Sequence, residues 1–86
     1  MQCFLVAVVK RNYNKNTMRV TKTKLVKLQC FDKKRNAVEF YDKQKNEYLN
    51  NNDWVLSYEN ERYSAFSDRV QGRLKVLSIR LKSITV

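Results

Sequence analysis

At 86 residues the chain is long enough for one domain, and a formal net charge of +10 without any histidine makes it strongly basic. A domain of this size buries roughly 60 to 65% of the surface that its unfolded chain exposes, so it has little stability in reserve. The composition excludes histidine-dependent proton transfer, and a chain with a single glycine contains no glycine-rich phosphate-binding or dinucleotide-binding turn. The charge favours an anionic partner, with solubility as the alternative use for it.

The charges are unevenly distributed along the chain. Residues 1–30 carry seven cations and no acid, and residues 69–86 carry five cations and no acid. All eight acids lie within residues 31–68, together with six cations. If the N-terminal and C-terminal strands lie side by side, their basic side chains form one patch with the acidic middle turned elsewhere. The alternative is that the cations are spread around a solvated surface.

The cysteines bear on metals and on the compartment. Cys3 and Cys30 cannot complete a four-ligand zinc site in a chain without histidine, so we expect neither a metal nor a cofactor. The apolar run 4–9 follows no basic segment and is too short to span a bilayer, so neither a signal peptide nor membrane attachment is expected. We expect a cytoplasmic protein with reduced thiols, and a Cys3–Cys30 disulfide between neighbouring strands is the alternative.

The first third of the chain predicts two strands. The apolar run 3–9 is typical of a central strand covered on both faces, and residues 12–16 predict a polar connection in which asparagines supply left-handed conformations. Tyr13 in this connection either packs back on the sheet or stacks on a base. Residues 18–31 predict a strand whose apolar alternation is interrupted by lysines. A bulge near Thr23, or a departure of the strand from the core, would explain the interruption. Lys22, Lys24 and Lys27 are spaced to meet phosphates, or they guard an edge strand against aggregation.

The middle of the chain predicts a hairpin and a loop. Residues 32–36 predict a hairpin tip between strands 28–31 and 37–41, with Phe31 opposite Val38 and Phe40 beside them. Residues 41–53 predict a loop with at most a short helical turn at 45–49.

A second hairpin is predicted between 54–58 and 62–66, turning at Asn60 and Glu61. It pairs Tyr58 with Tyr63 and Leu56 with Ala65, so these residues and Trp54 would share one face. We interpret this aromatic face as core and not as a stacking platform for bases.

The last strand has the clearest pattern. A turn at Gln71 and Gly72, in preference to a helix beginning at Ser67, is followed by a strand over 73–86. Leu77, Ile79 and Leu81 are expected to face the core, with Ser78, Arg80 and Lys82 facing outward.

Together these elements predict one basic globular domain over residues 1–86. The fold class is mainly β, a single small antiparallel sheet or barrel-like domain of five to six strands, with one short helix allowed and α+β as the fallback.

The function that we expect is non-enzymatic binding of nucleic acid through an electrostatic basic face. RNA or single strands are favoured because no recognition helix for the major groove can be located. Lys22, Lys24, Arg80 and Lys82 are expected to form one basic stripe if they lie on neighbouring strands of one face. The candidate contacts are Lys10, Arg11, Lys15, Arg19, Lys22, Lys24, Lys27, Arg73, Arg80 and Lys82, with Tyr13 as a stacking candidate.

Two other function classes remain open. The first is an inhibitor that binds a host protein such as a toxin or a defence nuclease, with or without an RNA bridge. The brevity, the lack of proline and the many Lys and Asn residues are typical of small proteins from AT-rich bacteriophage or viral genomes. The second is a nuclease without histidine, for which Tyr13 beside Lys10, Arg11 and Lys15 is the one candidate constellation.

Overall fold

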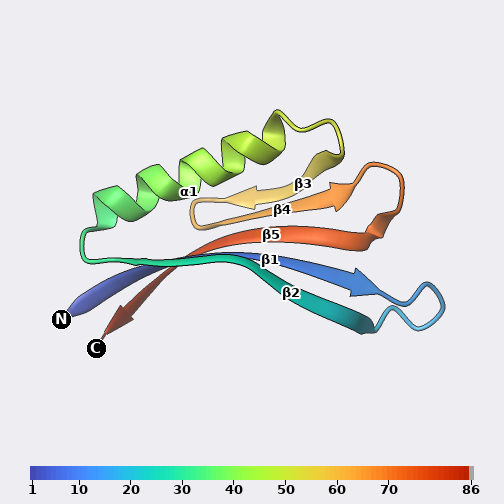
Figure 1. The fold of residues 1–86 in the computed structure, drawn as a ribbon, viewed down its shortest axis with the longest axis horizontal. Helices are drawn as coiled ribbons and strands as arrows, with labels where there is room; N and C mark the ends of the chain where they lie inside the picture. Colours follow the sequence, from blue (N-terminus) through green and yellow to red (C-terminus); the bar gives the residue numbers. More distant parts are fainter. Residues whose placement is uncertain (86) are drawn as a thin grey trace.

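A computed structural model describes residues 1–85 as one five-stranded antiparallel sheet with a single helix packed on it (Figure 1). The order of the strands in the sheet is β2-β1-β5-β4-β3. The elements along the chain are β1 (Gln2–Tyr13), β2 (Val20–Phe31), α1 (Lys34–Leu49), β3 (Trp54–Asn60), β4 (Tyr63–Asp68) and β5 (Gly72–Thr85). The prediction of a mainly β fold, an antiparallel sheet or barrel-like domain of five to six strands with one short helix allowed, is confirmed in the form of an open five-stranded sheet with one helix.

The N-terminal and C-terminal strands pair directly, which meets the condition that the sequence left open. β1 and β5 are antiparallel from Gln2 opposite Thr85 to Asn12 opposite Lys75. β2 pairs with the other edge of β1. Because β1 and β5 are antiparallel, the start of β1 and the end of β5 lie together at one end of the sheet (Figure 1).

The alternation predicted for the last strand is confirmed. Leu77, Ile79 and Leu81 are buried, and Arg80 and Lys82 are exposed. Ser78 also points away from the helix, as predicted, but it is buried because it lies between Val9 and Ala65 in the middle of the sheet.

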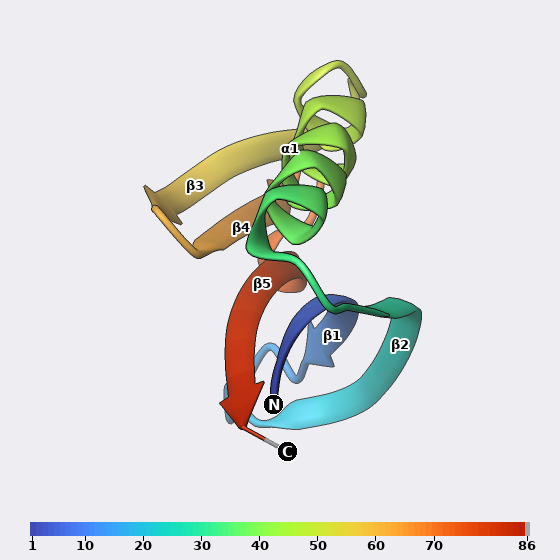
Figure 2. The same ribbon diagram turned by 90° about the vertical axis from the view of Figure 1, so that its left-hand side faces the viewer.

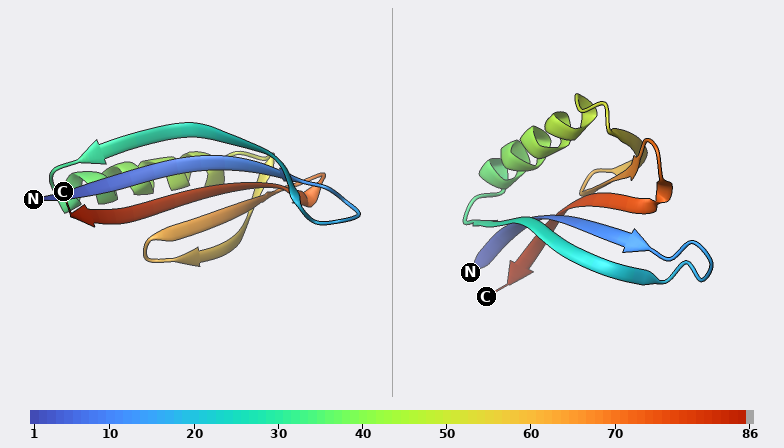
Figure 3. Two further views of the ribbon diagram at one scale, coloured as in Figure 1. Left: turned by 90° about the horizontal axis from the view of Figure 1, so that it is seen from below. Right: turned by 45° about the vertical axis from the view of Figure 1, so that its right-hand side comes forward.

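β1 is a central strand, but α1 covers only one of its faces. Val6 and Val8 are fully buried on the helix side. Leu5, Ala7 and Val9 point to the other face, which we call the open face, and are half-buried. The predicted coverage of both faces is therefore wrong, because α1 lies on one side of a strongly twisted sheet (Figures 2 and 3).

The largest correction is α1, which replaces both the hairpin predicted over 28–41 and the loop predicted over 41–53. Ala37, Tyr41 and Gln44 recur at helical spacing and are buried against the sheet. Phe31 and Phe40 do come together, with ring centroids 5.4 Å apart, but as a strand-to-helix contact and not across a ladder.

Local signals for this helix are weak. Lys33 at the N-cap makes no capping hydrogen bond, and the first turn contains no acid. The helix is therefore stabilised mainly by packing of its apolar face on the sheet.

β2 is one continuous strand, and its irregularities differ from the prediction. The ladder with β1 shifts register opposite Val8/Val9 and Asn12/Tyr13, which leaves Val26 and Thr21 unpaired, whereas the sequence predicts a bulge near Thr23 or a departure of the strand from the core. In the turn before β2, the left-handed backbone conformation belongs to Met18, with φ 56°, and not to an asparagine.

The β3–β4 hairpin is confirmed, but its predicted register is wrong. Tyr58 pairs with Ala65 and Asn60 with Tyr63, and a shift occurs at Ser57. Trp54 therefore lies in the core on the helix side, whereas Tyr58 and Tyr63 lie on the open face.

Asp68 organises the turn before β5, as its side chain accepts hydrogen bonds from the backbone N–H groups of Val70 (2.9 Å) and Gln71 (2.8 Å). Gly72 follows with a positive φ of 61°. Cys3 and Cys30 are both free thiols. In residues 1–85, no helix has the length and apolar character needed to cross a membrane.

Candidate nucleic-acid interface

The register of the sheet divides the basic side chains between two faces. Lys24 lies opposite Lys10, which in turn lies opposite the buried Leu77, so both lysines are on the helix side. Arg80 is three residues beyond Leu77, opposite Ala7, and therefore faces the open side. Lys82 shares that side, because it lies opposite Leu5. The predicted single stripe of Lys22, Lys24, Arg80 and Lys82 is wrong.

Four lysines meet in one hollow on the helix side of the sheet. Lys10, Lys22, Lys24 and Lys75, together with Asn12, line a cavity of 180 Å³, which we call the lysine groove. They come from three adjacent strands, where the sheet runs past the C-terminal end of α1 toward the β1–β2 turn (Figure 1). Lys24 stands opposite Lys10, and Lys22 and Lys75 stand on either side of Asn12.

Trp54 lies beside the lysine groove, in the core on the helix side and in the lining of the pocket that adjoins the groove. The indole is only 7% exposed, so the interpretation of Trp54 as a core residue is confirmed. The Nζ atoms of Lys10 and Lys75 lie 5.7 Å and 5.9 Å from the centroid of its ring. Cation–π attraction at such distances holds both ammonium groups over the ring. The groove therefore contains two cations that are drawn toward a buried aromatic residue.

A second pocket adjoins the lysine groove and shares Lys10 and Lys75 with it. This pocket of 230 Å³ also contains Asp53, Asp68 and Arg69. The pKa of Asp68 lies below its usual value, and the main cause is the hydrogen bond from the backbone N–H of Gln71. This carboxylate therefore stays ionised at neutral pH. Arg69 donates from Nε to the carbonyl of Asn52. The groove is thus bordered at this end by two carboxylates.

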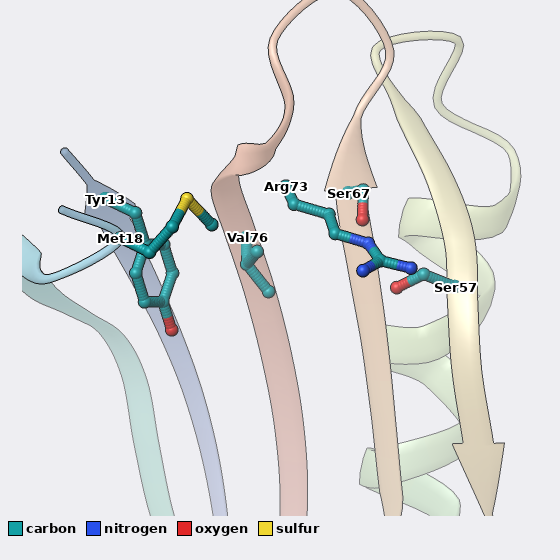
Figure 4. Close-up of a pocket in the computed structure, with 6 residues that line it drawn as sticks. All are labelled: Tyr13, Met18, Ser57, Ser67, Arg73 and Val76. Atoms are coloured by element: carbon teal, nitrogen blue, oxygen red, sulfur yellow. The ribbon is translucent and has the colours of Figure 1, made fainter. Parts of the chain in front are cut away.

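The open face carries a different pocket, of 370 Å³ (Figure 4). Arg73 reaches across β4 toward Ser57, and the side chains of Tyr13 and Met18 lie together at the other end of this pocket (Figure 4). Tyr13 is thus on the open face, whereas Lys10 lines the groove on the opposite face. The constellation predicted for a nuclease is not assembled.

The remaining predicted contact residues are dispersed. Lys15 and Arg19 are exposed in the β1–β2 turn, and Lys27 is exposed on β2. Arg11 lies opposite Val76 on the open face. The Arg80 guanidinium is stacked 5.2 Å from the centroid of the Tyr63 ring. The structure therefore brings together three of the ten predicted contact residues, Lys10, Lys22 and Lys24, in the lysine groove.

Sequence reasoning missed Lys75 and Asn12. A signal for Lys75 exists, because it stands two positions before Leu77 and so shares the face that the apolar residues of β5 occupy.

Comparison of the chain with protein-family models, with curated proteins and with solved structures found no match.

Proposed function

We propose that this protein binds single-stranded nucleic acid, RNA foremost, through the lysine groove and without catalysing a reaction. The observation that carries the proposal is the convergence of four lysines and one asparagine amide on a hollow whose lining, in the part of the chain that the structure describes, contains no carboxylate. Ammonium groups and amides are donors for phosphate oxygens.

The placement of these lysines is unfavourable for the free protein. Lys10 and Lys24 are directly opposite each other on paired strands, where like charges destabilise a sheet. Lys75 adds a third cation close to Lys10, because both lie over the ring of Trp54. Bound phosphates would relieve this repulsion and release counterions, which is the main source of affinity for nucleic acid.

The surface of α1 favours a single strand over a duplex. Its outward side contains Glu39, Asp42 and Glu47 around a shallow depression, with Lys43 as the cation among them. Carboxylates on this side would repel the phosphates that flank a major groove, so α1 is unsuited to enter one. A groove between strands can instead follow a flexible single-stranded backbone.

The test measures binding of fluorescently labelled single-stranded RNA, single-stranded DNA and duplex DNA over a series of salt concentrations. A triple variant, Lys22→Gln/Lys24→Gln/Lys75→Gln, should weaken binding and reduce the salt slope by about 0.7 for each phosphate that is no longer neutralised. The matched control is Arg73→Gln/Arg80→Gln/Lys82→Gln on the open face, which removes the same charge. Equal weakening in the two variants would show that the charge acts diffusely and would contradict the groove.

A second function, binding of an acidic protein surface as an inhibitor would, is favoured by the open face. Leu25 and Leu28 are each 54% exposed there, and Tyr58 is 55% exposed. Exposed apolar side chains on the same face as Arg80 and Lys82 are typical of an interaction surface for an acidic partner. The free thiols Cys3 and Cys30 fit a reducing compartment, so we place either function in the cytoplasm.

A pull-down from a nuclease-treated lysate tests this second function. A host protein that stays bound to the wild type but not to Leu25→Ser/Leu28→Ser supports direct recognition by the open face. A partner that leaves after nuclease treatment indicates an RNA bridge and argues against it.

A further inference from the structure

Resting on the proposed function, we infer that the lysine groove recognises a phosphorylated end of a single strand. The terminal phosphate would lie among the four lysines, and the sugar next to it would enter the adjoining pocket beside Asp53.

The size and charge of the groove favour one terminal phosphate. Its 180 Å³ lies between four lysines and one asparagine amide, which is room for one phosphate and its ester oxygen. A phosphate monoester carries about −1.5 to −2 charges at neutral pH, whereas an internal phosphodiester carries about −1. Four ammonium groups around one hollow are therefore better balanced by the monoester.

Two of the cations are held in place before any ligand arrives. Lys10 and Lys75 are only partly exposed, and their ammonium groups lie within 6 Å of the same indole ring. Such preorganisation reduces the side-chain entropy that binding costs. Lys22 and Lys24 are exposed and free to close over a third oxygen of the phosphate.

The carboxylates next to the groove explain why the groove would bind the end of a strand and not its middle. A strand that ran past Trp54 would bring its next phosphate to the carboxylates of Asp53 and Asp68, whose negative charges offset most of the attraction of the three cations in the same pocket. A sugar in the same place carries hydroxyl donors, and a carboxylate accepts hydrogen bonds from hydroxyl groups. Asp53 has the more available carboxylate of the two, because Oδ1 of Asp68 already accepts from the backbone N–H groups of Val70 and Gln71.

The experiment compares three versions of one short single-stranded RNA that bear a 5′-phosphate, a 3′-phosphate or hydroxyl groups at both ends. The wild type should bind one phosphorylated version at least about tenfold more tightly than the hydroxyl version, since one additional charge-assisted hydrogen bond contributes on that order. The version preferred identifies which end the groove accepts.

Three variants and one control locate the preference. Lys75→Gln should reduce the ratio of the two affinities to about one, and Lys24→Gln should reduce it partly. Asp53→Asn should also reduce the ratio, by strengthening binding of the hydroxyl-ended strand. Arg80→Gln, on the open face, should leave the ratio unchanged. Circular dichroism confirms that each variant is folded.

Equal affinity of the wild type for all three strands would overturn the inference while leaving the proposed function intact, provided that the binding is salt-dependent. Disappearance of the preference in Arg80→Gln as well would also overturn it. If none of the three strands binds, the proposed function fails together with the inference.

Discussion

The hydroxyl of Tyr41 lies 2.6 Å from the Oγ of Ser64, in the buried layer between α1 and β4. Tyr41 is 3% exposed and Ser64 is fully buried, so each hydroxyl depends on the other for a partner across the interface. This bond sets the rotation of α1 on the sheet more specifically than apolar packing can.

Tyr41→Phe should lower the free energy of unfolding by about 1 to 3 kcal/mol, because it leaves the Ser64 hydroxyl buried without its partner. Urea unfolding measures the change. The double variant Tyr41→Phe/Ser64→Ala should recover part of this stability. The matched control, Tyr58→Phe on the open face, should change stability by less than about 0.5 kcal/mol.

Stability should fall in alkaline solution partly through Tyr41. Burial raises the pKa of Tyr41 above its ordinary value, with Ser64 acting in the opposite direction. The folded state thus retains the phenolic proton to a higher pH than the unfolded chain, in which tyrosine titrates at about pH 10. The contribution is complete below that pH and disappears as the pH rises through the folded-state pKa. Tyr41→Phe should therefore show a shallower decline of the melting temperature above about pH 10 than the wild type, and an unchanged slope would contradict this.

Gln44→Met should stabilise the protein. Gln44 is 1% exposed, and its Oε1 has no hydrogen-bond partner in the described residues. A buried acceptor without a partner costs about 1 to 3 kcal/mol, and methionine has a similar length with no such group. Thermal unfolding should show a higher midpoint, whereas Gln29→Met on the exposed surface of β2 should not. A lower midpoint for Gln44→Met would mean that Gln44 has a partner in solution.

Trp54 should report binding in the lysine groove directly. It is the single tryptophan of the chain, and the ammonium groups of Lys10 and Lys75 lie near its ring. An anion that draws these cations away should change the intensity or wavelength of the indole emission on titration with RNA. The change should be absent in Lys10→Gln/Lys75→Gln. A ligand that binds only the open face should leave the emission constant.

The strands can be predicted from the sequence because their signal is local. Leu77, Ile79 and Leu81 alternate with polar residues, and one face of the sheet is buried as this pattern requires. The helix is harder to predict, because a glutamine, Gln44, occupies one of its core positions and its first turn carries cations in place of a cap.

The candidate site depends on register, which the sequence specifies poorly here. A shift of one residue moves a side chain to the opposite face, and the irregularities of β2 at Thr21 and Val26 decide where its lysines point. A pattern of cations along separate strands therefore predicts a basic protein, but it does not predict which cations share a face.

The central ladder of the sheet joins the first strand of the chain to the last. Val8 lies opposite Ile79, and the hairpin β1–β2 and the helix must both be spanned before this pair can close. Closing such a long loop costs conformational entropy before the strand contacts can offset it. Folds dominated by distant pairings therefore form slowly, on the order of milliseconds to seconds. Until β5 arrives, β1 exposes Val6 and Val8 along an unpaired edge, so the nascent chain should be prone to aggregation until its synthesis has passed Leu81.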